Sequence, residues 1–223
     1  MRSELELKQD IVEVGRRMWL RGYVAANDGN ISVRIGTDEF LCTPTGVSKG
    51  FMTPEMIIKV NSGGEVLSGE VQPSSELKMH LRAYRERPDV NAIVHAHPPV
   101  STAFAVAGIP LNKKFLPEVI VTLGEIPLAD YATPSTDEVP EAIAELVKDH
   151  DAVLLANHGA LTLGSDVFNA YYKLETMEHY ANISLAAKQI GGERELPSER
   201  IAQLMEVREK MGIKGAYPEF GKD

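Results

Sequence analysis

Two histidines spaced two residues apart are the side chains of this sequence best suited to chemistry. His95 and His97 end the apolar run 90–97, and because side chains alternate along a strand, both imidazoles face the same side. A pair of hydrogen-bonded core histidines is the alternative, but protonation of one ring would then repel the other, whereas a shared metal ion removes this conflict. His158 ends a second apolar run and precedes Gly159, where the backbone can turn sharply. Three imidazoles at strand ends predict a divalent metal site, most readily zinc, with a fourth position for a carboxylate, water or substrate.

Glu76 is the carboxylate best placed to complete such a site. It closes the segment Pro73-Ser74-Ser75-Glu76, at an expected helix start where backbone N–H groups point outward. A glutamate that only complements the helix dipole is the alternative interpretation. The remaining histidines, His80, His150 and His179, are interpreted as packing or solvent-facing residues.

Turns and a helix start supply a candidate anion site. Hydroxyls and free backbone N–H groups at such places bind phosphate oxygens, although ordinary turn and cap chemistry uses the same residue types. Lys49 could add positive charge to this site. The alternative interpretation is an ordinary loop lysine whose side chain is solvated. The candidate phosphate-binding residues are Asn30, Thr45, Gly46, Ser74 and Ser75.

The elements that must position these residues alternate between hairpins and helices. Helices are expected from the Ser3–Glu6 capping box to Gly22, and over 75–85, 100–107, 139–148, 166–189 and beyond 196. Strands are expected at 31–35, 39–43, 57–60, 90–97, 119–123, 151–157 and 160–163. The hairpins break the strict strand–helix alternation of a parallel sheet. The prediction is therefore an α/β fold with a largely antiparallel sheet covered by helices.

Composition narrows the class of protein. The 223 residues, 43% hydrophobic and 25% charged, fit one globular domain over 1–223. A protein that binds nucleic acid by neutralising its phosphates needs an excess of positive charge, whereas this chain has a formal charge of −9. No nucleic-acid partner is therefore expected. The single cysteine, Cys42, fits a reducing compartment. No signal peptide or long apolar run is found, so no membrane partner and a cytoplasmic location are expected.

The ordered set of motifs resembles the class II aldolase/epimerase family, which includes L-fuculose-1-phosphate aldolase and L-ribulose-5-phosphate 4-epimerase. The motifs that carry the resemblance are Gly29-Asn30-Ile31-Ser32, Thr43-Pro44-Thr45-Gly46, Ser74-Ser75-Glu76, His95-Ala96-His97 and Asn157-His158-Gly159. The resemblance implies zinc held by three histidines and Glu76, with substrate phosphate on the candidate anion site. It also implies a three-layer α/β/α fold and a homotetramer with active sites between subunits.

The resemblance further implies a reaction. In the aldolase branch, a phosphorylated ketose such as L-fuculose 1-phosphate or a 5-deoxyribulose 1-phosphate is cleaved reversibly to dihydroxyacetone phosphate and an aldehyde. The metal acts there as a Lewis acid, and Glu76 moves the proton at carbon. Epimerases of the family generally carry aspartate at this position, so Ser-Ser-Glu favours an aldolase. A 4-epimerase, a dehydratase or a decarboxylase on the same scaffold is the alternative, and a non-catalytic scaffold with structural zinc is a more remote one.

A second acid/base is the point where this chain departs from the fuculose aldolases, which use a tyrosine after the His-x-His strand. The corresponding stretch 114–119 has no tyrosine. Glu118 in that stretch looks similar to the acid/base glutamate of the related methylthioribulose-phosphate dehydratases, which lack Ser-Ser-Glu. A surface glutamate after Pro117 is the alternative. Tyr217 is a further candidate, since C-terminal tyrosines of some relatives reach a neighbouring subunit's site.

Overall fold

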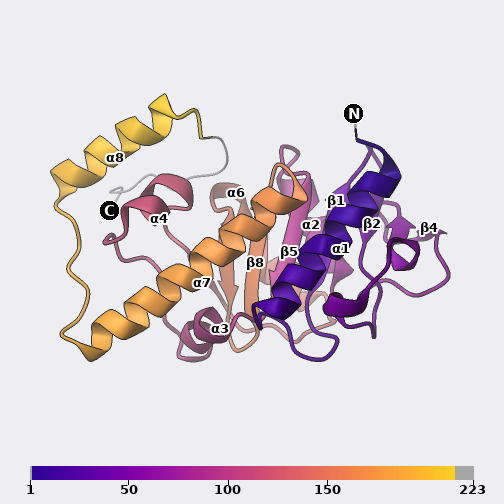
Figure 1. Ribbon diagram of the computed structural model, residues 1–223, viewed down its shortest axis with the longest axis horizontal. Helices are drawn as coiled ribbons and strands as arrows, with labels where there is room; N and C mark the ends of the chain where they lie inside the picture. Colours follow the sequence, from indigo (N-terminus) through magenta and orange to yellow (C-terminus); the bar gives the residue numbers. More distant parts are fainter. Residues whose placement is uncertain (1, 214–223) are drawn as a thin grey trace.

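An eight-stranded sheet forms the centre of the computed structural model, which describes residues 2–213 (Figure 1). The strand order is β4-β3-β2-β1-β5-β8-β7-β6, and every neighbouring pair is antiparallel except β6 and β7. The strands are β1 (Asn30–Arg34), β2 (Phe40–Cys42), β3 (Ile58–Val60), β4 (Val66–Ser68), β5 (Ala92–Ala96), β6 (Leu128–Ala129), β7 (Ala152–Leu155) and β8 (Gly159–Gly164). The predicted largely antiparallel sheet is confirmed.

Helices cover both faces of this sheet and so produce three layers. They are α1 (Glu4–Leu20), α2 (Leu77–Glu86), α3 (Pro99–Val106), α4 (Pro117–Thr122), α5 (Glu138–Ile143), α6 (Leu146–Asp149), α7 (Val167–Gln189) and α8 (Ser198–Lys210), with short 3₁₀ helices η1 (Lys49–Phe51) and η2 (Pro54–Met56). The three-layer α/β/α arrangement that the family resemblance implied is therefore confirmed.

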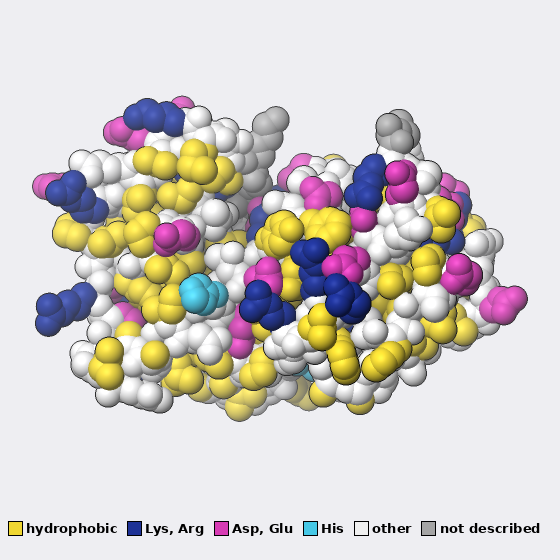
Figure 2. All heavy atoms as spheres, viewed as in Figure 1, with side chains coloured by type: hydrophobic (Ala, Val, Ile, Leu, Met, Phe, Trp, Pro, Cys, Tyr) yellow, Lys and Arg dark blue, Asp and Glu magenta, His cyan; other side chains and the backbone are white. Residues whose placement is uncertain are grey.

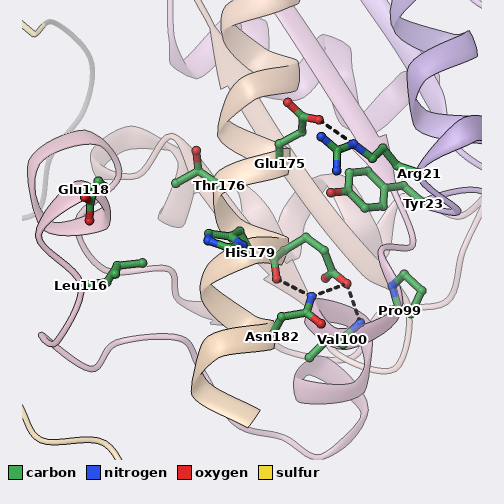
Figure 3. A pocket seen from close by; sticks show the side chains of 11 residues that line it. Arg21, Tyr23, Pro99, Val100, Leu116, Glu118, Glu175, Thr176, His179 and Asn182 are labelled. Atoms are coloured by element: carbon green, nitrogen blue, oxygen red, sulfur yellow. Dashed lines mark hydrogen bonds and ion pairs between the residues drawn. The ribbon is translucent and has the colours of Figure 1, made fainter. Parts of the chain in front are cut away.

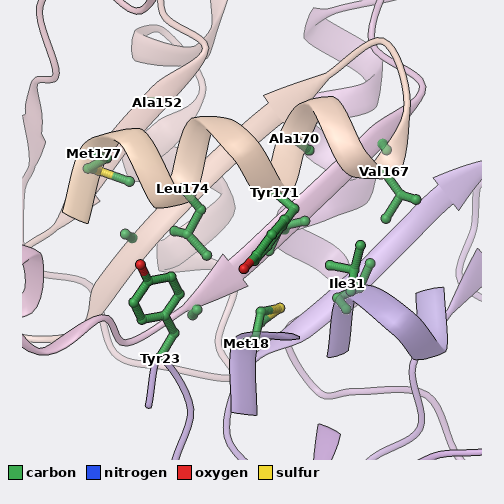
Figure 4. Packing of buried hydrophobic residues seen from close by; sticks show 14 of the residues in the cluster. Met18, Tyr23, Ile31, Ala152, Val167, Ala170, Tyr171, Leu174 and Met177 are labelled. Atoms are coloured by element: carbon green, nitrogen blue, oxygen red, sulfur yellow. The ribbon is translucent and has the colours of Figure 1, made fainter. Parts of the chain in front are cut away.

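The two faces of the sheet bury separate apolar cores because strand side chains alternate. Ile31 and Val94 lie in the core beneath α1, α3 and α7, and Figure 4 shows the inward side of α7 facing Met18 and Ile31. Ile93 lies in the opposite core, beneath α2, α5 and α6. His95 follows Ile93 by two residues on β5, so its ring faces the α2 side of the sheet.

The segment expected as a strand at 119–123 is instead the short helix α4, so that prediction was wrong. Its β-branched residues favour strands in general. In the structure Pro117 occupies the first helical turn, and the Thr122 hydroxyl donates to the Glu118 carbonyl at 2.7 Å, one helical turn away. The apolar side chains of α4 are buried, and the helix packs against α7 and α8. Tertiary packing therefore overrides the local propensity.

The helix expected over 139–148 is divided into α5 and α6. Ala144 and Glu145, which lie between them, keep helical dihedral angles. The Ala144 N–H donates to the Glu141 carbonyl at 3.2 Å, three residues back, and Lys148 repeats this pattern with Glu145 at 3.3 Å. The interruption is thus a tightening of the hydrogen-bond pattern at the junction.

The face built by α1 and α7 carries acidic and basic side chains side by side, with apolar groups exposed between them (Figure 2). On α1, for example, the Glu13 carboxylate accepts from both Arg16 and Arg17. Within residues 2–213, no helix combines the length and the apolar character that a membrane crossing requires.

Candidate metal centre and active site

Strands β5 and β8 bring three imidazoles to one place. His95 lies on β5, His97 follows the end of that strand, and His158 directly precedes β8. Because Ala96 lies opposite Ala160 in the antiparallel pair, His97 and His158 emerge at the same edge. One ring nitrogen of each histidine lies within 4.8 Å of the others, and the Nε2 atoms of His95 and His97 are 3.2 Å apart. These three residues form a histidine triad, as the sequence predicted.

The Nδ1 atoms of His95 and His97, which point away from the centre of the triad, fix the orientation of these two rings. His95 Nδ1 lies 2.9 Å from the Ala160 carbonyl oxygen, which can only accept, so Nδ1 carries the proton and Nε2 presents a lone pair. His97 Nδ1 lies 3.4 Å from the Asp28 carboxylate, which favours the same tautomer. Two lone pairs that face each other at 3.2 Å repel unless a cation lies between them. The donor set therefore fits a divalent metal ion, for which imidazoles oriented through their outer nitrogens are the usual ligands.

Glu76 occupies the N-cap position of α2 and directs its carboxylate at the triad. Oε1 lies 3.0 Å from His158 Nε2, Oε2 lies 3.4 Å from His95 Nε2, and Oε2 also accepts from Asn30 Nδ2 at 2.8 Å. Burial alone would raise the pKa of the Glu76 carboxyl, but the His95 and His158 imidazoles lower it well below its usual range. The four candidate ligands named from the sequence thus meet around one point.

Two parts of this arrangement were missed by the sequence interpretation, namely the Asp28 carboxylate and the Ala160 carbonyl. The sequence signal for Asp28 is its place in the turn directly before Asn30. The Ala160 carbonyl has no such signal, because its role depends on the register between β5 and β8. His80 was assigned to packing, and it is indeed buried, with its Nδ1 against a serine hydroxyl.

Gly159 permits the close approach of the two histidine-bearing strands. A Cβ at this position would lie 2.5 Å from both the Ala96 carbonyl oxygen and His97 Cδ2. We therefore expect Gly159→Ala to displace the His97 ring and to weaken metal affinity by about 10- to 100-fold, the usual range for disturbed support of a ligand. Titration of the metal-free protein with Zn²⁺ measures the change. Gly36→Ala is the matched control, since its Cβ would meet only ordinary contacts at 3.7 Å, and equal affinity for the two variants contradicts the prediction.

The candidate phosphate-binding residues lie on three neighbouring segments. The Thr45 N–H donates to the Gln72 carbonyl at 3.0 Å, and the Ser74 N–H donates to the Thr43 carbonyl at 3.3 Å, so the two loops run side by side. Asn30 heads β1, which pairs with the strand β2 that leads into the first loop. This arrangement gathers Asn30, Thr45, Gly46, Ser74 and Ser75 beside the N-terminus of α2.

Lys49 is buried, so its interpretation as a solvated loop lysine was wrong. Its ammonium donates to the carbonyls of Asn27 at 2.9 Å and Val47 at 2.7 Å, and it is 1% exposed. Burial lowers the pKa of Lys49 to about 8, while the carboxylates of Asp28 and Glu76 act in the opposite direction. The lysine ties the turn before β1 to the loop that contains Thr45 and Gly46.

Glu118 lies away from the triad, on α4, where it is exposed. It lines a cleft of about 790 Å³ together with Tyr23, Glu178 and His179, and no triad histidine lines this cleft (Figure 3). The cleft nevertheless begins close to the metal centre, since the Tyr23 carbonyl accepts the backbone N–H of His97. Tyr217 lies outside the described residues.

The three-histidine centre at the edge of the helix-covered antiparallel sheet supplies the donor set of a divalent metal site. The chain belongs to the Class II Aldolase and Adducin N-terminal domain family, whose model matches residues 9–185. It is therefore identified as an enzyme of the class II aldolase superfamily, with the aldolase and decarboxylase members both represented among its relatives.

Relatives of both kinds are similar to the chain to nearly the same degree. The 3-oxo-tetronate 4-phosphate decarboxylase of Escherichia coli (strain K12) is 34% identical over 184 residues, which are 81% of this chain and 86% of that protein. The L-fuculose phosphate aldolase of Methanocaldococcus jannaschii is 35% identical over 181 residues, which are 80% of this chain and 95% of that protein. A solved structure of L-fuculose 1-phosphate aldolase superposes with a TM-score of 0.85 at 31% identity, covering 92% of this chain and 96% of that one.

Proposed function

We propose that the protein is a metal-dependent aldolase that reversibly cleaves a phosphorylated ketose to dihydroxyacetone phosphate and an aldehyde. The observation that carries the proposal is the convergence of three imidazoles with the Glu76 carboxylate, which lies against two of the rings. This is the donor set of an open metal site with an acid/base group beside it. The non-catalytic scaffold is disfavoured because structural zinc sites are closed and rich in cysteine.

The triad of His95, His97 and His158 would hold the divalent ion, most readily Zn²⁺. When bound, the ion supplies Lewis-acid stabilisation of negative charge on substrate oxygens. Bond cleavage leaves an electron pair on the carbon next to the ketone, and that carbon must gain a proton. We assign this proton transfer to Glu76, which Asn30 orients through the hydrogen bond at 2.8 Å.

The substrate phosphate is assigned to the two loops beside the N-terminus of α2. Their hydroxyls and backbone N–H groups supply neutral donors, which matter in a chain with a formal charge of −9. Binding the phosphate here places the ketone end of a short sugar phosphate toward Glu76. The proposed phosphate ligands are Asn30, Thr45, Gly46, Ser74 and Ser75.

Decarboxylation of a 3-oxo sugar acid phosphate is the second candidate, because relatives with this name are as similar as the aldolases. The two reactions share their chemistry. Both break the bond to the carbon next to a ketone, and loss of CO₂ from 3-oxo-tetronate 4-phosphate also leaves dihydroxyacetone phosphate. Release of this product alone therefore does not distinguish them, whereas the other product, aldehyde or CO₂, does.

The test incubates the Zn²⁺-loaded protein separately with phosphorylated ketoses, including L-fuculose 1-phosphate, and with 3-oxo-tetronate 4-phosphate. Dihydroxyacetone phosphate, aldehyde and CO₂ are measured, with the metal-free protein as control. Aldehyde release in equal amount to dihydroxyacetone phosphate supports the aldolase. CO₂ release without aldehyde from any ketose contradicts it and supports the decarboxylase, and a change of configuration without cleavage supports a 4-epimerase.

Glu118 is proposed as the second acid/base, acting on the oxygen of the leaving aldehyde. Because Glu118 is exposed on α4, and no triad histidine of its own chain lines the cleft that it lines, we propose that it serves a neighbouring subunit within a homotetramer. We expect Glu118→Gln to lower kcat by about 100-fold, the lower range for loss of an acid/base group. Mixed oligomers of Glu118→Gln and Glu76→Gln protomers should regain part of the activity, since some sites then carry both glutamates. Unchanged kcat in Glu118→Gln would contradict the role and leave Tyr217 as the candidate, and light scattering after gel filtration measures the number of subunits.

A further inference from the structure

Between β1 and α2, two rows of polar side chains face each other inside an otherwise apolar layer. On β1 the alternate residues face α2, while Ile31 and Val33 face the other core. On α2 the facing residues recur every fourth position and so lie on one side of the helix. The β1 row is Asn30, Ser32 and Arg34, and the α2 row is Glu76, His80 and Tyr84. We name these six residues the β1–α2 polar contact.

Each member of one row is bonded to the other row. Asn30 Nδ2 donates to Glu76 Oε2 at 2.8 Å, and the Ser32 hydroxyl lies 2.7 Å from His80 Nδ1. The same Ser32 hydroxyl lies 2.9 Å from the Tyr84 hydroxyl. At the far end, the Arg34 guanidinium donates to the Tyr84 carbonyl at 2.7 Å and lies over its ring. The contact thus extends from the metal centre along about two turns of α2.

The centre of the β1–α2 polar contact is fully buried, and a polar contact has no advantage in stability there over an apolar one. Ser32 is 0% exposed, His80 1% and Tyr84 3%. A buried hydrogen bond stabilises a fold by only about 1 kcal/mol net, and apolar side chains of the same size would stabilise it about as well. Buried hydrogen bonds differ in that they specify one relative placement of the two elements. Burial also lowers the pKa of His80 to about 3, so the ring is neutral and its bond to Ser32 is unaffected by pH near neutrality.

The placement of α2 decides where the Glu76 carboxylate lies. Glu76 is the N-cap residue of α2, and the helix advances 1.5 Å per residue, so a small shift or rotation of α2 moves the carboxylate by a comparable distance. His80 lies one turn further along the same side of the helix and is bonded to β1. A displacement of about 1 Å in a catalytic group costs about 100-fold in rate.

We propose that Ser32 and His80 are positioning residues that hold the Glu76 carboxylate in register with His95 and His158. The inference about turnover rests on the proposed function of Glu76, whereas the inference about its position stands on the contacts alone.

The experiment compares Ser32→Ala, His80→Leu and His80→Asn with the wild type, all loaded with Zn²⁺. Ser32→Ala and His80→Leu are expected to lower kcat by about 10- to 100-fold, with bound zinc within about twofold of the wild type, because the triad is untouched. His80→Asn keeps a polar atom near the place of Nδ1 and is expected to recover most of the loss. Ser184→Ala removes another buried, hydrogen-bonded hydroxyl, on α7, and is expected to leave kcat unchanged, whatever its effect on the thermal midpoint.

Crystal structures of the same variants separate this proposal from the proposed function. The distances to compare are Glu76 Oε1 to His158 Nε2, 3.0 Å, and Glu76 Oε2 to His95 Nε2, 3.4 Å. A Glu76 carboxylate that is displaced, or that occupies several conformations, supports the positioning role even if the wild type cleaves none of the sugars tested. A carboxylate that stays in place in Ser32→Ala, together with unchanged kcat where turnover is measurable, overturns it. If His80→Leu does not fold, Ser32→Ala alone decides the question, since it removes a single atom.

Discussion

Replacing His158 by alanine is expected to remove bound divalent metal and to lower turnover by about 1000-fold or more. The triad would keep only the two imidazoles of β5, and Glu76 would lose its neighbour at 3.0 Å. Loss of the ion removes several kcal/mol of stabilisation of developing charge, which corresponds to this range of rate. Metal content by elemental analysis and kcat on the best substrate measure the two effects together.

His150→Ala is the matched control for this prediction. His150 lies on the connection between α6 and β7, where its Nδ1 bonds the Leu146 carbonyl at 2.8 Å, and it is not part of the triad. We expect this variant to retain metal and turnover. Full zinc occupancy in His158→Ala would exclude His158 from the ligand set and contradict the proposed site.

Chelation distinguishes a catalytic ion from a structural one. The two apolar cores lie on the faces of the sheet and are built without the triad, so removal of the ion is expected to abolish turnover while the far-ultraviolet circular dichroism is kept. Re-addition of Zn²⁺ should restore activity. Unfolding of the protein on chelation would instead support a scaffold in which metal binding and folding are one process.

Replacing Glu76 by glutamine is expected to lower kcat by about 100- to 10,000-fold while zinc stays bound. Glutamine keeps the shape of the side chain and an oxygen that can accept from Asn30, but it cannot take up and return a proton. The triad supplies three ligands without it. The step itself is measured by exchange of the carbon-bound proton of dihydroxyacetone phosphate with deuterium from the solvent, which should slow together with kcat.

Glu86→Gln provides the control at the other end of α2, where the partly buried carboxylate pairs with Arg82 at 2.8 Å, away from the triad. Glu86 is not part of the site, so kcat and deuterium exchange should be unchanged. Near-normal deuterium exchange in Glu76→Gln would contradict the proton-transfer role of Glu76. Glu76 would then be only the N-cap residue of α2, and the proton transfer would be unassigned.

Local features of the fold follow from the sequence because they depend on neighbouring residues. The capping box of Ser3 and Glu6 opens α1 as expected. The spacing of His95 and His97 places both rings on one side, since a strand repeats every two residues. The types of the site residues also predicted their chemistry, because imidazoles and a carboxylate are the ligands that zinc prefers.

Contacts between segments that are distant in the sequence were decided by the tertiary structure alone. His158 meets His95 because β8 pairs with β5 in one register, and a shift by one residue would turn the side chains to the other face. The ammonium of Lys49 is buried because two loop carbonyls surround it, and α4 is a helix because α7 and α8 cover its apolar side chains. Residue types and short spacings carry the chemistry of this protein, whereas the meeting of its reactive groups depends on packing between segments that the chain brings together only when folded.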